Sequence, residues 1–146
     1  MLSVYNYINS TSAPCNTSRA CYKDGYLFYP TEPMSTVIAA ANIVADQLNL
    51  ITTRDTTIDL FYSFDCCSVI GNYKVVLFGT ARAFMYDFDG ANFSLLGSSA
   101  SEYVGFVESA WADGDIIHIA SSTGVVAYDC SGVAPVLIAR YNAPGV

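Results

Sequence analysis

Apolar residues in the second half of the chain fall in short runs of five to seven residues, and glycine, aspartate and asparagine separate the runs. β-Branched and aromatic residues are frequent within them, which is typical of strands rather than helices. Eight strands are predicted on this pattern, at residues 64–70, 73–78, 82–88, 93–97, 106–112, 116–121, 124–130 and 135–141.

The pattern repeats with a fixed shift of 42 residues, so that residues 67–104 overlay residues 109–146 without a gap. A repeat of about this length with four short strands is the period of a β-propeller blade. The repeated positions are Tyr86-Asp87 with Tyr128-Asp129, Gly90 with Gly132, and Leu95-Leu96 with Leu137-Ile138.

Each of the three repeats contains a predicted hairpin near its start. Asp-Gly occupies positions 24–25 in the first repeat and 113–114 in the third, and each pair precedes an apolar run. Asp-Gly between two such runs is a strong hairpin signal, because glycine adopts the positive φ that the turn requires. Gly-Asn at 71–72 stands at the same place in the second repeat and is equally typical of turns.

Residues 34–49 fit two interpretations. As a helix, this segment would have a serine or threonine cap at its start and one apolar face. As strands, residues 38–43 align with 83–88, and residues 48–51 align with 93–96, each at a shift of 45 residues. We predict the strands and keep the helix as the alternative.

The pattern therefore predicts an all-β chain of three consecutive four-stranded antiparallel blades. Residues 20–63, 64–105 and 106–146 are expected to form the three blades. Residues 1–19 are expected to hold a leading strand, at residues 2–8, and a polar loop.

The third repeat resembles the LVIVD-type blade of bacterial and archaeal β-propeller proteins. The resemblance rests on the turn and apolar strand at 112–120, the strand 124–129 that ends in aspartate, and the proline-led strand at 135–145. It is strongest over the third repeat and weakest over the first. It implies a propeller fold with a binding or scaffold role, and it brings no catalytic residues. The chain departs from the related WD-repeat pattern, because Tyr-Asp stands at 86–87 and 128–129 in place of Trp-Asp.

Three blades are fewer than the four or more that close a propeller ring. Each blade buries its faces against its neighbours, so an arc of three is expected to leave two apolar end faces open. If one face measures roughly 800 Å², burying it is worth about 20 kcal/mol before opposing terms, against a net domain stability of about 5–15 kcal/mol. We therefore predict closure with a second copy, giving six blades with residues 2–8 donated at the join, or membership of a larger assembly.

Composition narrows the range of partners. Hydrophobic residues make up 53% of the chain and charged residues only 13%, which suits a subunit that is packed against others. The net charge of −7 and the lack of a basic stripe exclude a nucleic-acid backbone and an anionic membrane surface. The longest apolar stretch, 37–45, is too short to span a bilayer, and no signal peptide is recognisable. We expect a cytoplasmic or particle-associated chain.

The five cysteines are Cys15, Cys21, Cys66, Cys67 and Cys130. Their odd number and irregular spacing do not indicate a disulfide framework or a zinc site. Cys66 and Cys67 are adjacent on a predicted strand and would point to opposite faces, so we predict small, buried apolar side chains. Whether Cys15 pairs with Cys21 depends on the redox state of the compartment.

No motif defines a catalytic site. His118, the only histidine, lies in an apolar strand and is expected to be an ordinary sheet residue. Asp87 and Asp129 end the third strands of their repeats, where we predict that they accept backbone N–H hydrogen bonds from the following turn. Trp111, the only tryptophan, precedes a turn and is expected to pack in the core.

These observations favour a non-enzymatic, β-propeller-like structural or protein-interaction module without cofactor or metal, which acts through self-assembly or by binding other proteins. Two alternatives stay open. One is a propeller-type hydrolase or lyase at the mouth of the ring that uses His118 with Asp87 and Asp129. The other is an α+β ligand-binding domain with a helix at residues 34–49.

Overall fold

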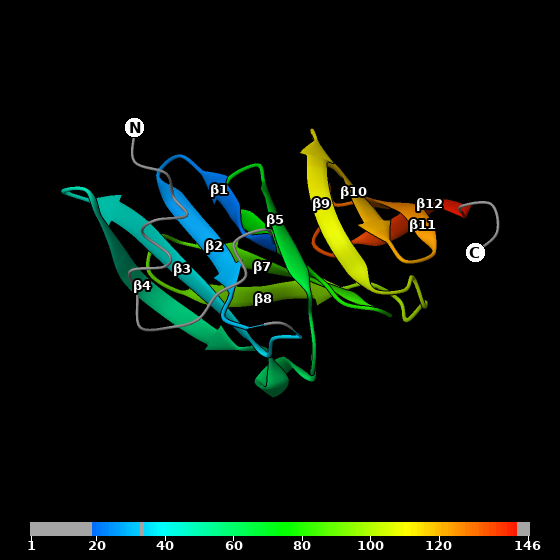
Figure 1. Cartoon of the computed structure of the whole chain (residues 1–146), viewed down its shortest axis with the longest axis horizontal. Helices are drawn as coiled ribbons and strands as arrows, with labels where there is room; N and C mark the ends of the chain where they lie inside the picture. Colours follow the sequence, from blue (N-terminus) through cyan, green and yellow to red (C-terminus); the bar gives the residue numbers. More distant parts are fainter. Residues whose placement is uncertain (1–18, 33, 143–146) are drawn as a thin grey trace.

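The computed structural model describes residues 19–32 and 34–142, and the predicted strand at residues 2–8 lies outside them. The described chain is all-β and contains three four-stranded antiparallel sheets (Figure 1). Within each sheet the strands lie side by side in chain order. The predicted fold class, three consecutive blade-like sheets, is confirmed.

The strands of the last two sheets agree with the predicted runs to within about two residues. A short 3₁₀ helix, η2 (Thr56–Asp59), connects the first sheet to the second. The first sheet contains β1 (Cys21–Lys23), β2 (Tyr26–Pro30), β3 (Val37–Val44) and β4 (Gln47–Asp55); the second contains β5 (Cys66–Ile70), β6 (Lys74–Phe78), β7 (Ala83–Phe88) and β8 (Phe93–Ser98); the third contains β9 (Val107–Asp113), β10 (Ile116–Ser121), β11 (Gly124–Asp129) and β12 (Val136–Asn142).

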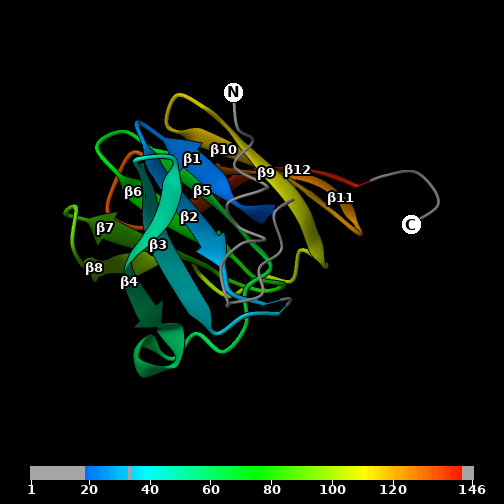
Figure 2. The same cartoon turned by 60° about the vertical axis from the view of Figure 1, so that its left-hand side comes forward.

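The sheets stack face to face like neighbouring propeller blades, with the second sheet in the middle. The first strands of the sheets converge, since β5 contacts both β1 and β9 (Figures 1 and 2). The last strands of the first two sheets, β4 and β8, meet on the other side of the stack. The third sheet thus lies at one end of the row.

Both faces of the middle sheet are buried, and its side chains alternate accordingly. In β6, Val76 and Phe78 pack toward the third sheet, whereas Val75 and Leu77 pack toward the first, and each is at most 1% exposed. Fully burying side chains of this size stabilises the fold by about 1.5–3 kcal/mol each. The continuous apolar run of β6 is therefore the signature of a sheet with neighbours on both sides.

The helix alternative for residues 34–49 is wrong. This segment forms β3, a tight turn and the start of β4. Ile38, Ala39, Ala40 and Ala41 are at most 1% exposed. Ile38 and Ala40 are buried in one cluster and Ala39 and Ala41 in another, which is the pattern of a strand in a sheet that is covered on both faces.

Two of the predicted turns have shifted boundaries. Asp24-Gly25 forms the first turn as predicted, with φ of 50° and 90°. In the third sheet Asp113 pairs with Ile116, so the turn residues are 114–115 rather than 113–114. In the second sheet Ile70 pairs with Lys74, so that loop holds three residues rather than two.

Within the described ranges, 19–32 and 34–142, no helix is long and apolar enough to cross a membrane.

Candidate functional site

The third sheet has one buried face and one exposed face. Val107, Ile117, Ile119, Val126 and Tyr128 pack against the second sheet. By alternation along the strands, the residues between them point away from that sheet. We call this second surface the open face. It carries Ser109, Trp111, Asp113, Ile116, His118, Ala120, Val125, Ala127, Asp129, Val136, Ala139 and Tyr141, so two carboxylates, Asp113 and Asp129, lie among its apolar side chains.

Three of its large apolar side chains are well exposed, namely Trp111 at 46%, Val136 at 57% and Tyr141 at 64%. Ile116, His118 and Val125 are half-buried. Aromatic side chains on a sheet face have the composition of a protein-binding surface, since tyrosine and tryptophan are enriched at interfaces. Trp111 lies on one edge strand of the sheet, β9, and Val136 and Tyr141 lie on the other, β12.

The repeat explains why much of this face is apolar. In the second sheet, Val76, Phe78, Ala83 and Met85 are at most 2% exposed because the third sheet covers them. Forty-two residues later the same positions hold His118, Ala120, Val125 and Ala127. The open face of the third sheet is therefore the equivalent of the surface of the second sheet that the third sheet covers.

The expectation that Trp111 packs in the core is wrong. Trp111 pairs with His118 across β9 and β10, and the two rings stack with centroids 5.4 Å apart at 14°. Its counterpart Val69 pairs with Val75, whose side chain faces the first sheet. The hairpin loop of the third sheet is one residue shorter, and a one-residue change of register moves a side chain to the opposite face.

His118 supplies an unusual feature of the open face. Its Nδ1 atom is buried and has no hydrogen-bond partner among the described residues. No described carboxylate or thiol is hydrogen-bonded to its ring, so His118 lacks the neighbours that a catalytic triad requires.

The expectation of two open end faces is wrong for the first sheet. Its side chains that point away from the second sheet are Leu27, Tyr29, Ala39 and Ala41, and each is at most 2% exposed. They form an apolar cluster of their own, against which Ala20 and Leu48 pack. Closure of a six-blade ring would need this surface to be free, whereas it is already buried.

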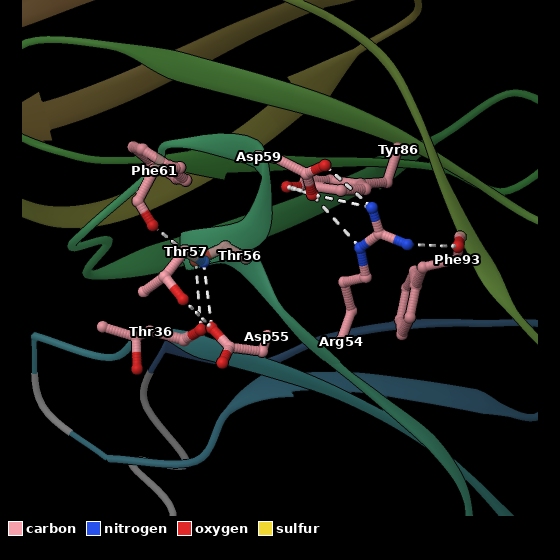
Figure 3. Close-up of polar contacts among 9 residues, drawn as sticks. All are labelled: Thr36, Arg54, Asp55, Thr56, Thr57, Asp59, Phe61, Tyr86 and Phe93. Carbon is pink, nitrogen blue, oxygen red and sulfur yellow. Dashed lines mark hydrogen bonds and ion pairs between the residues drawn. The ribbon is translucent and has the colours of Figure 1, made fainter.

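A polar cluster joins the first two sheets (Figure 3). Arg54 binds Asp59 in bidentate fashion, with Nη2–Oδ1 and Nε–Oδ2 distances of 2.8 and 3.1 Å. The Tyr86 hydroxyl donates to Asp59 Oδ2 at 2.9 Å. Burial and the hydrogen bond to Asp59 raise the pKa of Tyr86, and the hydrogen bond to Asp59 raises the pKa of Arg54. Each charged group already has its partner, so the cluster is a structural tie rather than a reactive site.

A second charged cluster lies where the first strands converge. Arg19 Nη1 is 3.5 Å from Asp65 Oδ1, and Arg19 Nη2 is 3.4 Å from Glu108 Oε2. The Asp65 side chain is only 6% exposed. Burial raises the pKa of Asp65, while the Arg19 guanidinium opposes the rise. Sequence reasoning missed this pair of carboxylates, because the two residues are far apart in the chain and match no motif.

The carboxylates at the strand ends have mostly the predicted role. Asp129 Oδ1 accepts a hydrogen bond from the Ser131 N–H at 2.9 Å, which lowers the pKa of Asp129. In the second sheet Asp89, rather than Asp87, accepts from the N–H groups of Ala91 and Asn92. The prediction for Asp87 is therefore wrong by two residues. Asp87 and Phe88 are still paired in β7, so the loop begins at Asp89.

The described cysteines are largely buried, as predicted. Cys66, Cys67 and Cys130 are at most 3% exposed, and Cys21 is half-buried. Burial raises the pKa of Cys66 and raises the pKa of Cys130 to about 12. No group of three or more potential metal ligands occurs in the part of the chain that the structure describes.

A cavity of about 280 Å³ lies between the outer parts of the second and third sheets. Glu102 is the one ionisable residue among its lining, and Arg140 Nη2 lies 3.3 Å from Glu102 Oε1. The volume falls at or below the lower end of typical ligand pockets. The lining residues are Ser98, Ser99, Ala100, Glu102, Ala134, Pro135, Val136 and Leu137.

Comparison with known proteins adds information on the fold. No protein-family model and no curated protein sequence matches the chain, and the LVIVD resemblance therefore has no family match behind it. Among solved structures, the chain is similar to the glutaminyl cyclase of Myxococcus xanthus, with a TM-score of 0.57 and 12% identity. The similarity covers 80% of this chain and 50% of the cyclase chain, so the present chain spans about half of that enzyme's length. At this identity the similarity shows a shared propeller-like fold.

Proposed function

We propose that the chain is a non-enzymatic assembly module that binds a second copy of itself through the open face of the third sheet. The observation that carries the proposal is the exposure of Trp111, Val136 and Tyr141 on a surface whose counterpart in the second sheet is buried. Large aromatic residues are frequent anchors of an interface, and Trp111 and Tyr141 supply one at each edge of the sheet.

The burial of the first sheet's outer surface determines how two copies pair. Because Leu27 and Tyr29 are covered, the third sheet of one copy finds no free first sheet on the other. The same surface must then serve both partners, which gives an isologous twofold interface. Two sheets packed face to face about 10 Å apart resemble a β-sandwich.

Light scattering coupled to size-exclusion chromatography tests this proposal. Wild-type chain is expected to elute as a dimer, and Trp111→Glu or Val136→Glu is expected to shift it to monomer, since a buried unpaired carboxylate weakens association by about 30-fold or more. Ile58→Glu is the matched control, because Ile58 is 66% exposed on η2 and lies outside the open face. Equal effects of Ile58→Glu and Trp111→Glu would contradict the proposal.

A hydrolase or lyase is the second candidate, and the Arg19–Asp65–Glu108 cluster is the observation that favours it. Two carboxylates bridged by a guanidinium could serve acid–base chemistry where the first strands converge. The similar solved structure is a glutaminyl cyclase, so a glutaminyl peptide is one rational substrate to test, beside chromogenic esters and glycosides. Turnover that is lost in Glu108→Gln and retained in His118→Ala would support this candidate. Equal turnover in the wild type, Glu108→Gln and His118→Ala would contradict this candidate.

A further inference from the structure

Two thiols from different sheets are in contact. Cys21 on β1 and Cys67 on β5 place their Sγ atoms 3.5 Å apart, although 46 positions separate them in the chain. The two strands belong to the first and second sheets and lie next to each other. A disulfide needs an S–S distance of about 2.05 Å, so a rotation of one side chain or a small backbone shift is enough to close the gap.

The surroundings select this pair over the other described cysteines. Cys66 is adjacent to Cys67 but points to the opposite face, where it packs in the cluster between the second and third sheets. Cys130 belongs to that same cluster. Cys67 also lies 3.4 Å from the carbonyl oxygen of Phe28, the residue that pairs with Cys21 in the β1–β2 hairpin.

We propose that Cys21 and Cys67 form an oxidisable dithiol, which a small-molecule disulfide such as oxidised glutathione converts into a covalent link between the first two sheets. Cys21 is the half-exposed member, and its thiolate attacks one sulfur of the glutathione disulfide and expels one glutathione thiolate. The Cys67 thiolate then attacks Cys21 Sγ and expels the second glutathione. The dithiol loses two electrons and two protons, and one glutathione disulfide becomes two glutathione thiols.

The order of the two steps follows from exposure and acidity. The hydrogen bond with Cys21 and complete burial both raise the pKa of Cys67, which leaves little thiolate for the second attack. The first mixed disulfide is therefore expected on Cys21 and is expected to persist until Cys67 resolves it. The closed link should raise the thermal midpoint of the chain by about 10 °C, because it constrains a long loop in the unfolded state.

The experiment uses the full chain, treated with oxidised glutathione at about pH 8 and quenched with an alkylating reagent. Peptide mapping of the wild type and of Cys66→Ser is expected to show a Cys21–Cys67 linkage, with the mass of two hydrogen atoms lost. Cys67→Ser is expected to stop at a glutathione adduct on Cys21. Cys21→Ser provides a second variant at a half-exposed position. It is expected to form neither the linkage to Cys67 nor a glutathione adduct at position 21.

Three results would overturn the proposal. The first is a Cys15–Cys21 linkage, which competes for the same thiol. The second is a wild type that stops at the glutathione adduct on Cys21. The third is a thermal midpoint that rises equally in wild type and Cys67→Ser. Oxidation of chain unfolded in denaturant is the reference, and there the native selectivity for Cys67 is expected to vanish.

Discussion

At the scale of single residues, the Asp59 carboxylate carries the most concentrated polar interaction between the first two sheets. It accepts from the Arg54 guanidinium and from the Tyr86 hydroxyl, and Tyr86 is fully buried. Asp59 is the hydrogen-bond partner of the buried Tyr86 hydroxyl, whereas the partly exposed Arg54 also donates from Nη1 to the Phe93 carbonyl oxygen at 3.5 Å. Asp59 contributes to stability less through the attraction between the charges than by avoiding the cost of leaving the Tyr86 hydroxyl without an acceptor and Arg54 without an ion-pair partner.

Replacement of Asp59 by alanine tests this role. We expect Asp59→Ala to lower the free energy of unfolding by about 2–3 kcal/mol. The substitution removes the hydrogen-bond acceptor of the Tyr86 hydroxyl and the ion-pair partner of the partly buried Arg54. Urea denaturation measures the change. Asp113→Ala is the matched control at an exposed position, with an expected change within about 0.5 kcal/mol. Similar losses in both variants would contradict the structural tie.

Asp65 and Asp89 should affect the pH dependence of stability in opposite directions. Burial raises the folded-state pKa of Asp65, so its contribution is present at acid pH and is lost as pH rises through the folded value. Hydrogen bonds from Asn92 and Ala91 lower the pKa of Asp89, so its contribution is present at neutral pH and is lost as pH falls below about 4.

Urea denaturation at acid and neutral pH separates the two carboxylates. Asp65→Asn is expected to reduce the loss of stability that accompanies a rise from about pH 4 to neutrality. Asp89→Asn is expected to reduce the loss that accompanies acidification below about pH 4. If both variants alter the profile in the same direction, the electrostatic account of Asp65 fails.

At the scale of elements, the tight turns show what the sequence pattern predicts well and what it misses. Alternating runs and a 42-residue repeat suffice for the strands of the second and third sheets. The predicted strands at 38–43 and 48–51 imply a connection, but the residues of the β3–β4 turn carry no turn signal of their own, because Ala45 and Asp46 adopt φ of 50° and 62° without a glycine. A turn of this type normally uses Asn-Gly or Asp-Gly, so an alanine there gives no signal.

Substitution at Ala45 tests the strain in this turn. Ala45→Gly is expected to raise the free energy of unfolding by about 1 kcal/mol. The left-handed conformation costs an L-residue about 1–2 kcal/mol, and glycine removes this cost. Glycine also increases the conformational entropy of the unfolded chain, which offsets part of the stabilisation. Ala112→Gly, at an exposed position inside β9, is the control and is expected to lower the stability. A loss in both variants would contradict the assigned turn.

The contacts between sheets could not be predicted from sequence. The Arg19–Asp65–Glu108 cluster and the Cys21–Cys67 contact each join residues more than 40 positions apart. Their side chains meet only because the sheets stack with their first strands together. Asp129 was predictable because its partner is two residues away. Local hydrogen bonds follow from residue type, whereas long-range pairs follow from packing.

At the scale of the whole molecule, the stack is asymmetric. One end is closed, since the outer side chains of the first sheet are at most 2% exposed. The other end presents the open face, with Trp111, Val136 and Tyr141 all well exposed. Under the proposed function, a twofold contact between two open faces covers this end of both copies, and pairing then stops at the dimer.

Sedimentation equilibrium of the wild-type chain tests this central claim most directly. The measurement covers concentrations from about 1 μM to 1 mM, the range in which pairing worth about 4–8 kcal/mol becomes visible. The account predicts a monomer–dimer equilibrium that stops at two copies and moves toward monomer in Trp111→Glu. A single species with the mass of one chain across the whole range would contradict it, as would continued growth beyond the dimer.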